Sequence, residues 1–520
     1  MNTILSFHHI SKSCTAIIIF GLITLTACTK KFDEINTDPT TFSSFTPATI
    51  PNAFAKAEYQ GIYGDPGIYQ LARNLFVDLW SQYYATIDPG VSPDKYVQRK
   101  DWEFYQWLSM YSSAYPTLKQ VIDATENTDI PANAVAKVWK VYIFHSNTDF
   151  YGPVPYFQAG SGQFSISYDA QKDIYYDMFK VLDTAVTALK TTDASAKPFG
   201  DNDLIYHGDV TKWLKLANTL RLRLALRISF VEPDKAKEEA EKAVADGVMT
   251  SNDDNAMMDV ATASPNGLNL MSPWGGFRMS ASMESYLKGF SDPRMPVYFS
   301  PAPDDNEYHG IRNGLSVAQL AGANPGGAGN NLSNIGPGWN PDLAASNKLT
   351  VMYSSEAYFL RAEGALNGWN MGGTAKELYE KGITNSMQQW DIDNAAIQTY
   401  LQSTSLPAKP GDYMNSPAVS NIPVKFSDDP EKQRQQIATQ KWLALFPDGI
   451  EAWAEVRRTG YPQLYPVVNS DNPDVPASEI IKRFTFIDLE YESNKQAVQN
   501  ALPLLNGPDK NNTPVWWDVK

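Results

Sequence analysis

The chain has 520 residues, only two cysteines and a formal net charge of -15 at pH 7. Such a surface repels phosphate backbones, and no cluster of Lys and Arg forms a local exception, so we expect no nucleic-acid partner. Stability has to come from a packed core, which 43% hydrophobic residues can supply in one large unit or two closely joined units.

The first residues have the pattern of a secretory signal peptide. A polar start that carries Lys12 precedes an apolar run from Ala16 to Ala27, which ends in small residues. A helix that crosses a bilayer needs roughly 20 apolar residues, and this run is shorter. We therefore expect residues 1–27 to be removed from the mature protein.

The cysteine at the end of this run predicts a lipid anchor. Leu25-Thr26-Ala27-Cys28 resembles the bacterial lipobox, in which the cysteine receives lipid and becomes the first mature residue. Two or more acyl chains give stable anchoring, whereas one chain binds a membrane only marginally. We expect Cys28 to be lipidated and residues 28–51 to form a tether. A soluble secreted protein cut near Ala27, with Cys28 as an incidental thiol, is the alternative.

Helical periodicity dominates the rest of the chain, whereas strand signals are few and short. The expected helices cover residues 68–86, 102–125, 132–149, 170–190, 210–230, 233–246, 279–289, 350–367, 373–390, 394–402, 430–446 and 448–459.

Neighbouring helices form pairs, which predicts an all-α fold of tetratricopeptide-like helical hairpins. Helix 210–230 precedes a charged helix that begins at Pro233, a favourable first helical residue. The helices at 350–367 and 373–390 are joined by a short glycine-containing turn. The repeat spacing is irregular, so we expect a degenerate repeat rather than a regular array.

A change of composition marks residues 250–345, where Gly, Pro and Asn accumulate while aromatic residues persist. A loop-rich segment of this length inside a helical protein is usually functional or disordered, and its aromatic content argues against disorder. We expect a mostly irregular ligand-binding region within a single domain over residues 52–520.

Several motifs in a fixed order resemble the SusD/RagB family. They are the lipobox with FDEINTDPT, then NTDFYGPVPY, YHGDVTKWLKLANTLRLRLALR, SDPRMPVYF with YHGIRNGLS, AYFLRAEGALNGW with LYEKGITNSMQQW, ALFPDGIEAWAEVRRTGYPQL and VWWD. The resemblance covers essentially the whole mature chain, and it is closest to the SusD-like lipoproteins of Bacteroidetes.

The resemblance implies an outer-membrane lipoprotein, exposed at the cell surface, with a tetratricopeptide-containing helical fold. Family members cover a SusC-like TonB-dependent transporter and help capture oligosaccharides, or in some members peptides, for uptake. A protein that only stabilises the transporter remains open as a further interpretation. A surface glycoside hydrolase is the enzyme alternative, and we expect no enzymatic activity.

Binding of sugars requires flat aromatic faces beside hydrogen-bonding groups. Aromatic residues that lie beside turn-forming residues are therefore the candidate ligand contacts. Aromatic residues in helical proteins, however, more often belong to the core. The candidates are Trp274, Phe277 and Arg278 in SPWGGFRMS, Trp339 and Asn340 in GPGWN, and Trp80, Tyr83 and Tyr84 in DLWSQYYAT.

Glu356 and Glu363 lie two helical turns apart, about 10 Å between their Cα atoms. Two carboxylates at such a distance can indicate a glycosidase, but apolar residues share their face, which indicates a packing surface. Buried Glu side chains require cationic partners. We therefore predict structural ion pairs with Arg457 and Arg458.

Other catalytic and metal-binding signals are weak. The three histidines beyond residue 27 show no zinc-site spacing, and the acidic stretch 251–255 lacks the EF-hand spacing and glycine, so a helix-terminal turn is the better interpretation. GANPGGAGNN lacks the Lys-Ser/Thr of a phosphate loop, and no GxSxG motif occurs. We expect no catalytic residue, metal or cofactor.

Overall fold

The computed structural model describes residues 46–163 and 165–520. The expected signal peptide and the predicted lipidation site at Cys28 lie outside the described residues. Contacts group residues 51–520 into one unit. Within the described ranges, none of the helices combines the length and the apolar character that a membrane span requires.

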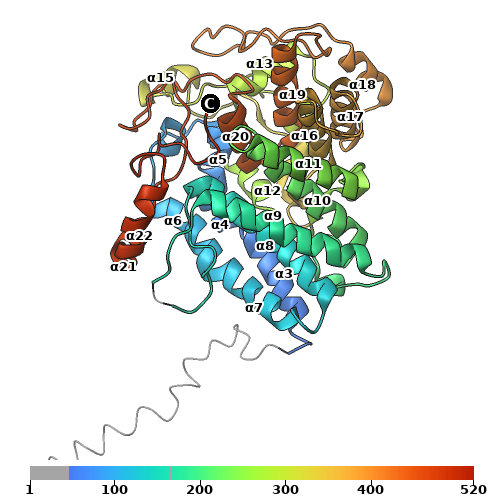
Figure 1. The fold of residues 1–520 in the computed structure, drawn as a ribbon. Coiled ribbons are helices and arrows are strands. Elements are labelled where there is room, and N and C mark those ends of the chain that lie inside the picture. Colours follow the sequence, from blue (N-terminus) through green and yellow to red (C-terminus); the bar gives the residue numbers. More distant parts are fainter. Residues whose placement is uncertain (1–45, 164) are drawn as a thin grey trace, which may run out of the picture. The chain divides into compact units, whose positions relative to one another are not determined.

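Helices form most of the regular structure (Figure 1), which confirms the predicted all-α fold. The longer helices are α3 (Ile50–Gly61), α6 (Lys100–Leu108), α7 (Tyr115–Thr125), α8 (Ile130–Tyr151), α9 (Gln171–Thr191), α10 (Val210–Arg227), α11 (Pro233–Asp246), α13 (Ala281–Gly289), α16 (Ser354–Leu366), α17 (Ala375–Gln388), α18 (Asn394–Leu401), α19 (Pro430–Leu445) and α20 (Gly449–Thr459). The shorter helices are α4 (Pro66–Tyr69), α5 (Val77–Trp80), α12 (Gly267–Met271), α14 (Met295–Tyr298), α15 (Val317–Ala323), α21 (Asp488–Ser493) and α22 (Lys495–Ala501).

Consecutive helices pack as hairpins, as the sequence predicts. α8 packs against α9, α10 against α11, and α16 against α17, and these pairs lie side by side in Figure 1. In the last pair a Cβ on Gly382 would come within 2.8 Å of the Phe359 ring, so the close approach of the two helices depends on that glycine. Thr374 and Glu377 form a capping box that starts α17.

Two expected helices are interrupted. Residues 68–86 break at Phe76 (φ -128°, ψ -85°) and again at Gln82, where φ is +54°, so α5 is short and a strand follows it. Between α6 and α7 the chain forms a wider π-type turn, Ser109–Ala114, and Pro116 is the second residue of α7. Because proline has no N–H to donate, the regular hydrogen-bond ladder cannot continue through this position.

Three two-stranded antiparallel sheets occur in the described residues. β1 (Tyr84–Thr86) pairs with β3 (Phe277–Met279), β2 (Ala256–Met258) with β6 (Leu349–Met352), and β4 (Phe299–Ser300) with β5 (Asn334–Ile335). Each sheet includes at least one strand from residues 250–345. The pairing therefore fixes much of this loop-rich region to the helical body.

A chain of buried ion pairs connects the packed helices α10, α16, α19 and α20. Arg223 binds Glu356 (2.6 Å), Lys441 binds Glu455 (3.0 Å), and Arg227 binds Glu451. All six side chains are buried. Buried charges are tolerated only when they are paired and hydrogen-bonded, so these contacts fix the register of the helices.

One of the two ion pairs predicted for the glutamates on α16 is present, and the other glutamate has a different partner. Arg458 binds Glu363 at 2.6 Å, as predicted. Glu356 instead binds Arg223 on α10. Arg457 is buried too, but it donates to backbone carbonyls, and its guanidinium lies 3.4 Å from the centre of the Trp453 ring. α20 thus turns its two arginines toward different neighbours.

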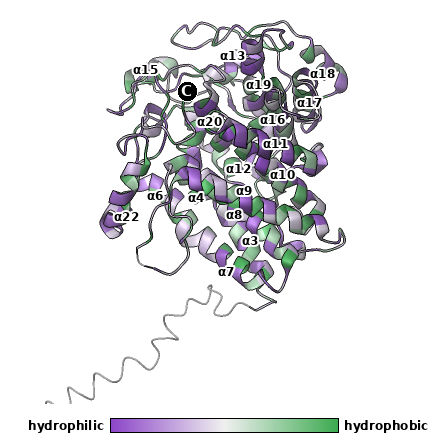
Figure 2. Cartoon of the chain, viewed as in Figure 1, coloured by the Kyte–Doolittle hydropathy of each residue, from purple (hydrophilic) through white to green (hydrophobic). Residues whose placement is uncertain are grey.

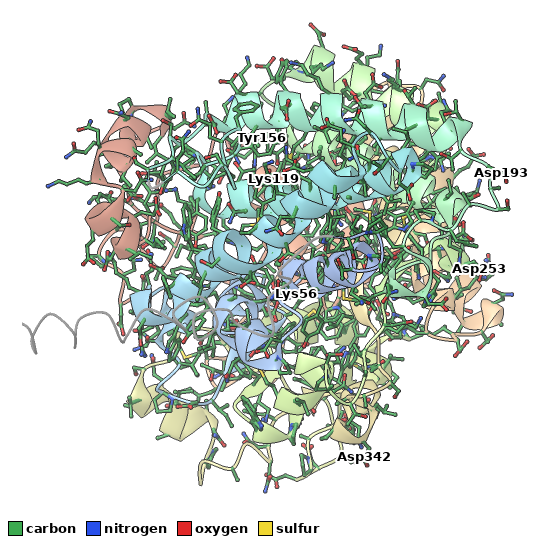
Figure 3. The ribbon with its side chains drawn as sticks, turned by 90° about the horizontal axis from the view of Figure 1, so that it is seen from below. Lys56, Lys119, Tyr156, Asp193, Asp253 and Asp342 are labelled. Carbon is green, nitrogen blue, oxygen red and sulfur yellow. The ribbon has the colours of Figure 1, made fainter. Side chains whose placement is uncertain are left out.

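Many of the remaining charged residues lie at the surface. Hydrophilic and hydrophobic residues are interleaved along the helices (Figure 2), as expected for helices with one buried face. Asp193, Asp253 and Asp342 are exposed and lie at the margin of the view in Figure 3. The acidic net charge is therefore displayed to solvent.

Candidate functional site

Trp274 is the one expected aromatic contact that is open to solvent, with 60% of its surface exposed. It ends a short turn, Ser272–Trp274, between α12 and β3. Gly275 follows in the left-handed region at φ +68°, and a Cβ on Gly276 would meet no atom within 4 Å. The ring of Trp274 therefore has free space beside it.

The predicted contacts Trp80, Tyr83 and Tyr84 are wrong, because all three side chains belong to the core. The indole N–H of Trp80 donates to the carbonyl of Pro93 (3.0 Å), and the Tyr83 hydroxyl donates to the carbonyl of Trp442 (2.6 Å). Tyr84 lies in β1 with its ring inside an aromatic cluster. None of these rings can offer a face to a ligand.

Phe277 and Trp339, which were also predicted as ligand contacts, are buried too. Phe277 is 5% exposed and packs against Tyr84, whereas Trp339 is 4% exposed and packs against Phe446. The neighbouring Asn340 is exposed, but its side chain accepts the N–H of Asp342 and thereby starts a short turn. These residues hold the loops, and Trp339 lines only a small interior cavity of about 130 Å³.

Arg278 positions the turn that carries Trp274. Its buried guanidinium donates to the carbonyls of Gly275, Phe277, Ala328 and Gly329, and burial lowers the pKa of Arg278. Within the described ranges no carboxylate lies at ion-pair distance from it. Arg278 therefore connects the Trp274 turn to the glycine-rich loop and makes no contact that a ligand could share.

The glycine-rich loop over residues 322–332 begins at the last two residues of α15 and is tightly held. Gly326, Gly327 and Gly329 all have φ between +69° and +79°, which favours glycine. Asn324 accepts the N–H of Gly329 at 2.7 Å, and Asn331 donates to the carbonyl of Ala323 at 2.9 Å. These bonds close the loop on itself.

Tyr413 is an exposed aromatic residue that the sequence analysis did not select. It is 55% exposed, and a Cβ on Gly322 would come within 2.7 Å of its ring, so the ring rests on the glycine at the end of α15. Tyr413 therefore stands at the start of the glycine-rich loop, and Arg278 connects the turn that carries Trp274 to Ala328 and Gly329 near its other end. Tyr413 lies in a non-helical segment far along the chain, where periodicity gives no signal.

A cavity of about 290 Å³ lies beside Tyr413. Its lining includes three carboxylates and one imidazole, and the lining residues are Asp304, Asp305, His309, Gly310, Ile311, Gly322, Ala323, Pro325, Asn331, Leu332, Gly411, Asp412 and Tyr413. His309 Nε2 lies 2.7 Å from Asp305 Oδ2. We call this cavity, together with Trp274 and the glycine-rich loop, the loop face.

Glu284 on α13 holds two of the loops that line this cavity. Its Oε2 accepts the N–H of Gly310 (2.7 Å) and its Oε1 accepts the N–H of Gly411 (3.0 Å). The side chain is buried, and this burial raises the pKa of Glu284 although the two N–H groups oppose the shift. One carboxylate thus sets the spacing of two segments that are distant in sequence.

The loop face offers aromatic surfaces and hydrogen-bond acceptors, whereas the two glutamates once considered as an acid–base pair are engaged elsewhere. Both oxygens of Glu356 and of Glu363 accept from arginine in the helical interior. In the described residues, no group of three or more His, Cys, Asp or Glu side chains is placed to hold a metal ion.

Comparison with known families decides the relationship of this chain. Residues 34–518 match the SusD-like family model, which is described as a Susd and RagB outer membrane lipoprotein. The chain belongs to the SusD-like family. The family is one of outer-membrane lipoproteins, in agreement with the localisation that the sequence predicts. A search of curated proteins found no match.

Solved structures similar to this SusD-like chain include two chitin-binding proteins. A chitin-binding SusD homologue from Flavobacterium johnsoniae is 38% identical, with a TM-score of 0.84, and the match covers 91% of this chain and 99% of that chain. A SusD-like protein from Bacteroides thetaiotaomicron is 32% identical (TM-score 0.83; 91% and 99% covered). A further chitin-binding protein is 31% identical (TM-score 0.74; 90% and 100% covered).

Proposed function

We propose that this SusD-like protein binds a glycan at the loop face and delivers it to a transporter. The observation that carries the proposal is the exposed ring of Trp274 on a turn that Arg278 fixes to the glycine-rich loop. A pre-formed aromatic face binds a pyranose ring without first losing conformational freedom. Tyr413, at the other end of the loop, supplies a second such face.

Chitin-type oligosaccharides are the ligand class that we favour. Two similar structures are of chitin-binding proteins. The carboxylates of Asp304 and Asp305 line the cavity beside Tyr413 and can accept hydrogen bonds from sugar hydroxyls or amides. We infer that one sugar ring stacks on an aromatic face while neighbouring groups bond to these oxygens.

Anchoring and delivery complete the proposal. Lipidation at Cys28 would hold the protein at the outer membrane, where it would transfer its ligand to a SusC-like TonB-dependent transporter. No bond is broken in this mechanism. Peptide binding and a purely structural role at the transporter are the outcomes that would replace glycan binding.

The test is isothermal titration of the purified protein with a soluble chitin hexasaccharide. Trp274→Ala and Tyr413→Ala should each raise the Kd about tenfold, the loss of one good stacking contact, and the double variant should show no binding. Phe157→Ala is the matched control, because Phe157 is 54% exposed but lies outside the loop face.

Three results would contradict the proposal. Unchanged affinity in the double variant would remove the loop face as the site. Failure of the wild-type protein to bind any chitin oligosaccharide would favour the peptide-binding or structural role. Release of shorter oligosaccharides during the titration would identify a hydrolase instead.

A further inference from the structure

A second cavity, of about 680 Å³, lies among the helical hairpins and shares no lining residue with the loop face. It is lined by the ends of α10, α16 and α20 and by the starts of α11 and α19. The lining residues are Ser229, Phe230, Pro233, Glu363, Asn367, Trp369, Glu431, Arg434, Ile437, Ala438, Thr459, Gly460, Tyr461, Gln463 and Lys520. Its volume lies within the range of about 300–1,000 Å³ that is typical of small-molecule sites. We call it the repeat cavity.

Three partly exposed aromatic side chains line the repeat cavity, and each lies just beyond the end of a helix. They are Phe230, Trp369 and Tyr461. The hydroxyl of Tyr461 donates to Glu431 Oε1 at 2.5 Å, which orients the ring and raises the pKa of Tyr461 to about 12. The aromatic walls are therefore partly fixed before a ligand arrives.

Arg434 gives the repeat cavity a cation without a carboxylate partner. Its Nη1 donates to Asn367 Oδ1 at 2.9 Å, and within residues 46–163 and 165–520 no carboxylate lies at ion-pair distance from it. Arg458 differs from Arg434, because it donates to two carboxylates, those of Glu363 and Glu455. The remaining donors of Arg434 are thus available to a ligand.

Other cavity groups also favour an acceptor-rich ligand. Lys520 Nζ lies 4.4 Å from the centre of the Phe230 ring, so a second cation borders the aromatic wall. The carboxylate of Glu363 is neutralised by Arg458, and one oxygen of Glu431 accepts from Tyr461. Arg434 and Lys520 thus bring two cations to a cavity that also contains the carboxylate of Glu431.

We propose that the repeat cavity is a second saccharide site, which binds a sugar that carries a carboxylate, a uronic acid. The guanidinium of Arg434 receives the carboxylate, for which its planar donors are geometrically matched. The rings of Trp369 and Tyr461 offer apolar faces to the pyranose. The site is separate from the loop face and does not depend on the function proposed for it.

The test is titration of the purified protein with glucuronic acid, with glucose and acetate as the two comparison ligands. Glucose has the ring without the charge, and acetate has the charge without the ring. Glucuronic acid should bind at least tenfold more tightly than either. Arg434→Gln should lower its affinity about tenfold, to that of glucose, and Trp369→Ala should abolish the binding.

Two controls separate this site from the rest of the protein. Arg99→Gln is the control variant, because it removes an arginine that pairs with Asp101 at 2.7 Å and lines neither cavity. It should leave glucuronic acid binding unchanged, as should the Trp274→Ala/Tyr413→Ala double variant. Thermal unfolding of Arg434→Gln and Trp369→Ala verifies that both variants are folded.

Four results would overturn the proposal: no binding of glucuronic acid at millimolar concentration, equal binding of glucose, equal binding of acetate, or full affinity in the Arg434→Gln variant. Loss of glucuronic acid binding in the loop-face double variant would also overturn it, because that result would place the ligand at the other site.

Discussion

Arg223 holds Glu356 at two points in the interior, with Nη2 2.6 Å from Oε2 and Nε 2.8 Å from Oε1. Both side chains are buried, so each charge depends on the other for its solvation. The pair joins α10 to α16, and Glu451 on α20 lies 3.6 Å from the same guanidinium. Three helices therefore meet at one arginine.

Removal of one charge from this pair should be costly. We expect Glu356→Gln to lower the free energy of unfolding by about 3–5 kcal/mol, because a buried guanidinium loses its bidentate partner and keeps only the more distant Glu451. Asp123→Asn is the control, since it breaks a partly exposed pair with Lys119 (2.6 Å) and should cost less than about 1 kcal/mol. Urea unfolding measures both, and equal losses would contradict the prediction.

Glu284→Gln tests the carboxylate that spaces the loops of the loop face. Glutamine has one acceptor oxygen, so either Gly310 or Gly411 loses the acceptor of its N–H. We expect the Kd for chitin hexasaccharide to rise about fivefold to tenfold, in line with the loss of one hydrogen bond worth about 1 kcal/mol. Amide hydrogen exchange should become faster at these two glycines, and unchanged exchange would count against the positioning role.

Gly329→Ala tests the fit of the glycine-rich loop. A Cβ at Gly329 would lie 2.4 Å from Nη2 of Arg278, which four carbonyl bonds hold in place, and 2.7 Å from Ile87 Cδ1. Gly326→Ala has the same positive φ but meets no neighbour. We expect losses of unfolding free energy of about 2–3 and about 1 kcal/mol respectively. Similar thermal shifts for the two variants would show that crowding at Arg278 is unimportant.

Glu103 should make stability depend on pH. Burial raises its pKa from 4.5 to about 8, and the neighbouring Gln98 and Lys100 oppose this shift only in part. The folded state therefore holds the proton more tightly than the unfolded state. The resulting stabilisation is complete below pH 4.5 and is lost as the pH rises to about 8.

The variant Glu103→Gln removes this ionisation and should be more stable than the wild type above pH 8, by several kcal/mol at most. Near pH 4.5 the two proteins should be similar. Burial raises the pKa of Asp94 to about 7, so both proteins also lose stability as the pH rises through that value. Urea unfolding at pH 5, 7 and 9 measures the difference, and parallel curves would refute the assignment to Glu103.

Cys28→Ala tests the lipid anchor. Cells that express the natural chain should incorporate radioactive palmitate into this protein and retain it in the outer-membrane fraction. The variant should incorporate none and leave the membrane, because the acyl chains supply the apolar area that binds the bilayer. Equal labelling of both proteins would place the lipid elsewhere or exclude it.

Local periodicity was sufficient for most helices, because an apolar stripe and a cap are encoded within one segment. Residues 233–246 form α11 with the predicted bounds, and the predicted pair of helices around Gly372 exists. The prediction of one helix over residues 68–86 is wrong at its end, because Tyr84–Thr86 pairs with a strand almost two hundred positions later. α3 was not predicted, although Ala53 and Ala57 have helical spacing.

The proposed binding surface is harder to predict, because exposure depends on contacts between distant segments. Trp274 and Trp339 have similar glycine-rich neighbours, yet one ring is 60% exposed and the other 4%. Phe446 accounts for the difference, since it fills the space over Trp339. Tyr413 and Glu284 gave no sequence signal, because their roles arise only where α13, α15 and the loops meet.

The ion pairs between α10, α16, α19 and α20 limit how these proteins can be recombined. A helix transplanted from a relative would bring charges that match its former neighbours, so chimaeras should fold only when the contacting helices are exchanged as a block. The loop face contains no such chain of ion pairs, and short strands, Arg278 and Glu284 hold it in place. Ligand preference can therefore be engineered by loop grafting while the interior is left intact.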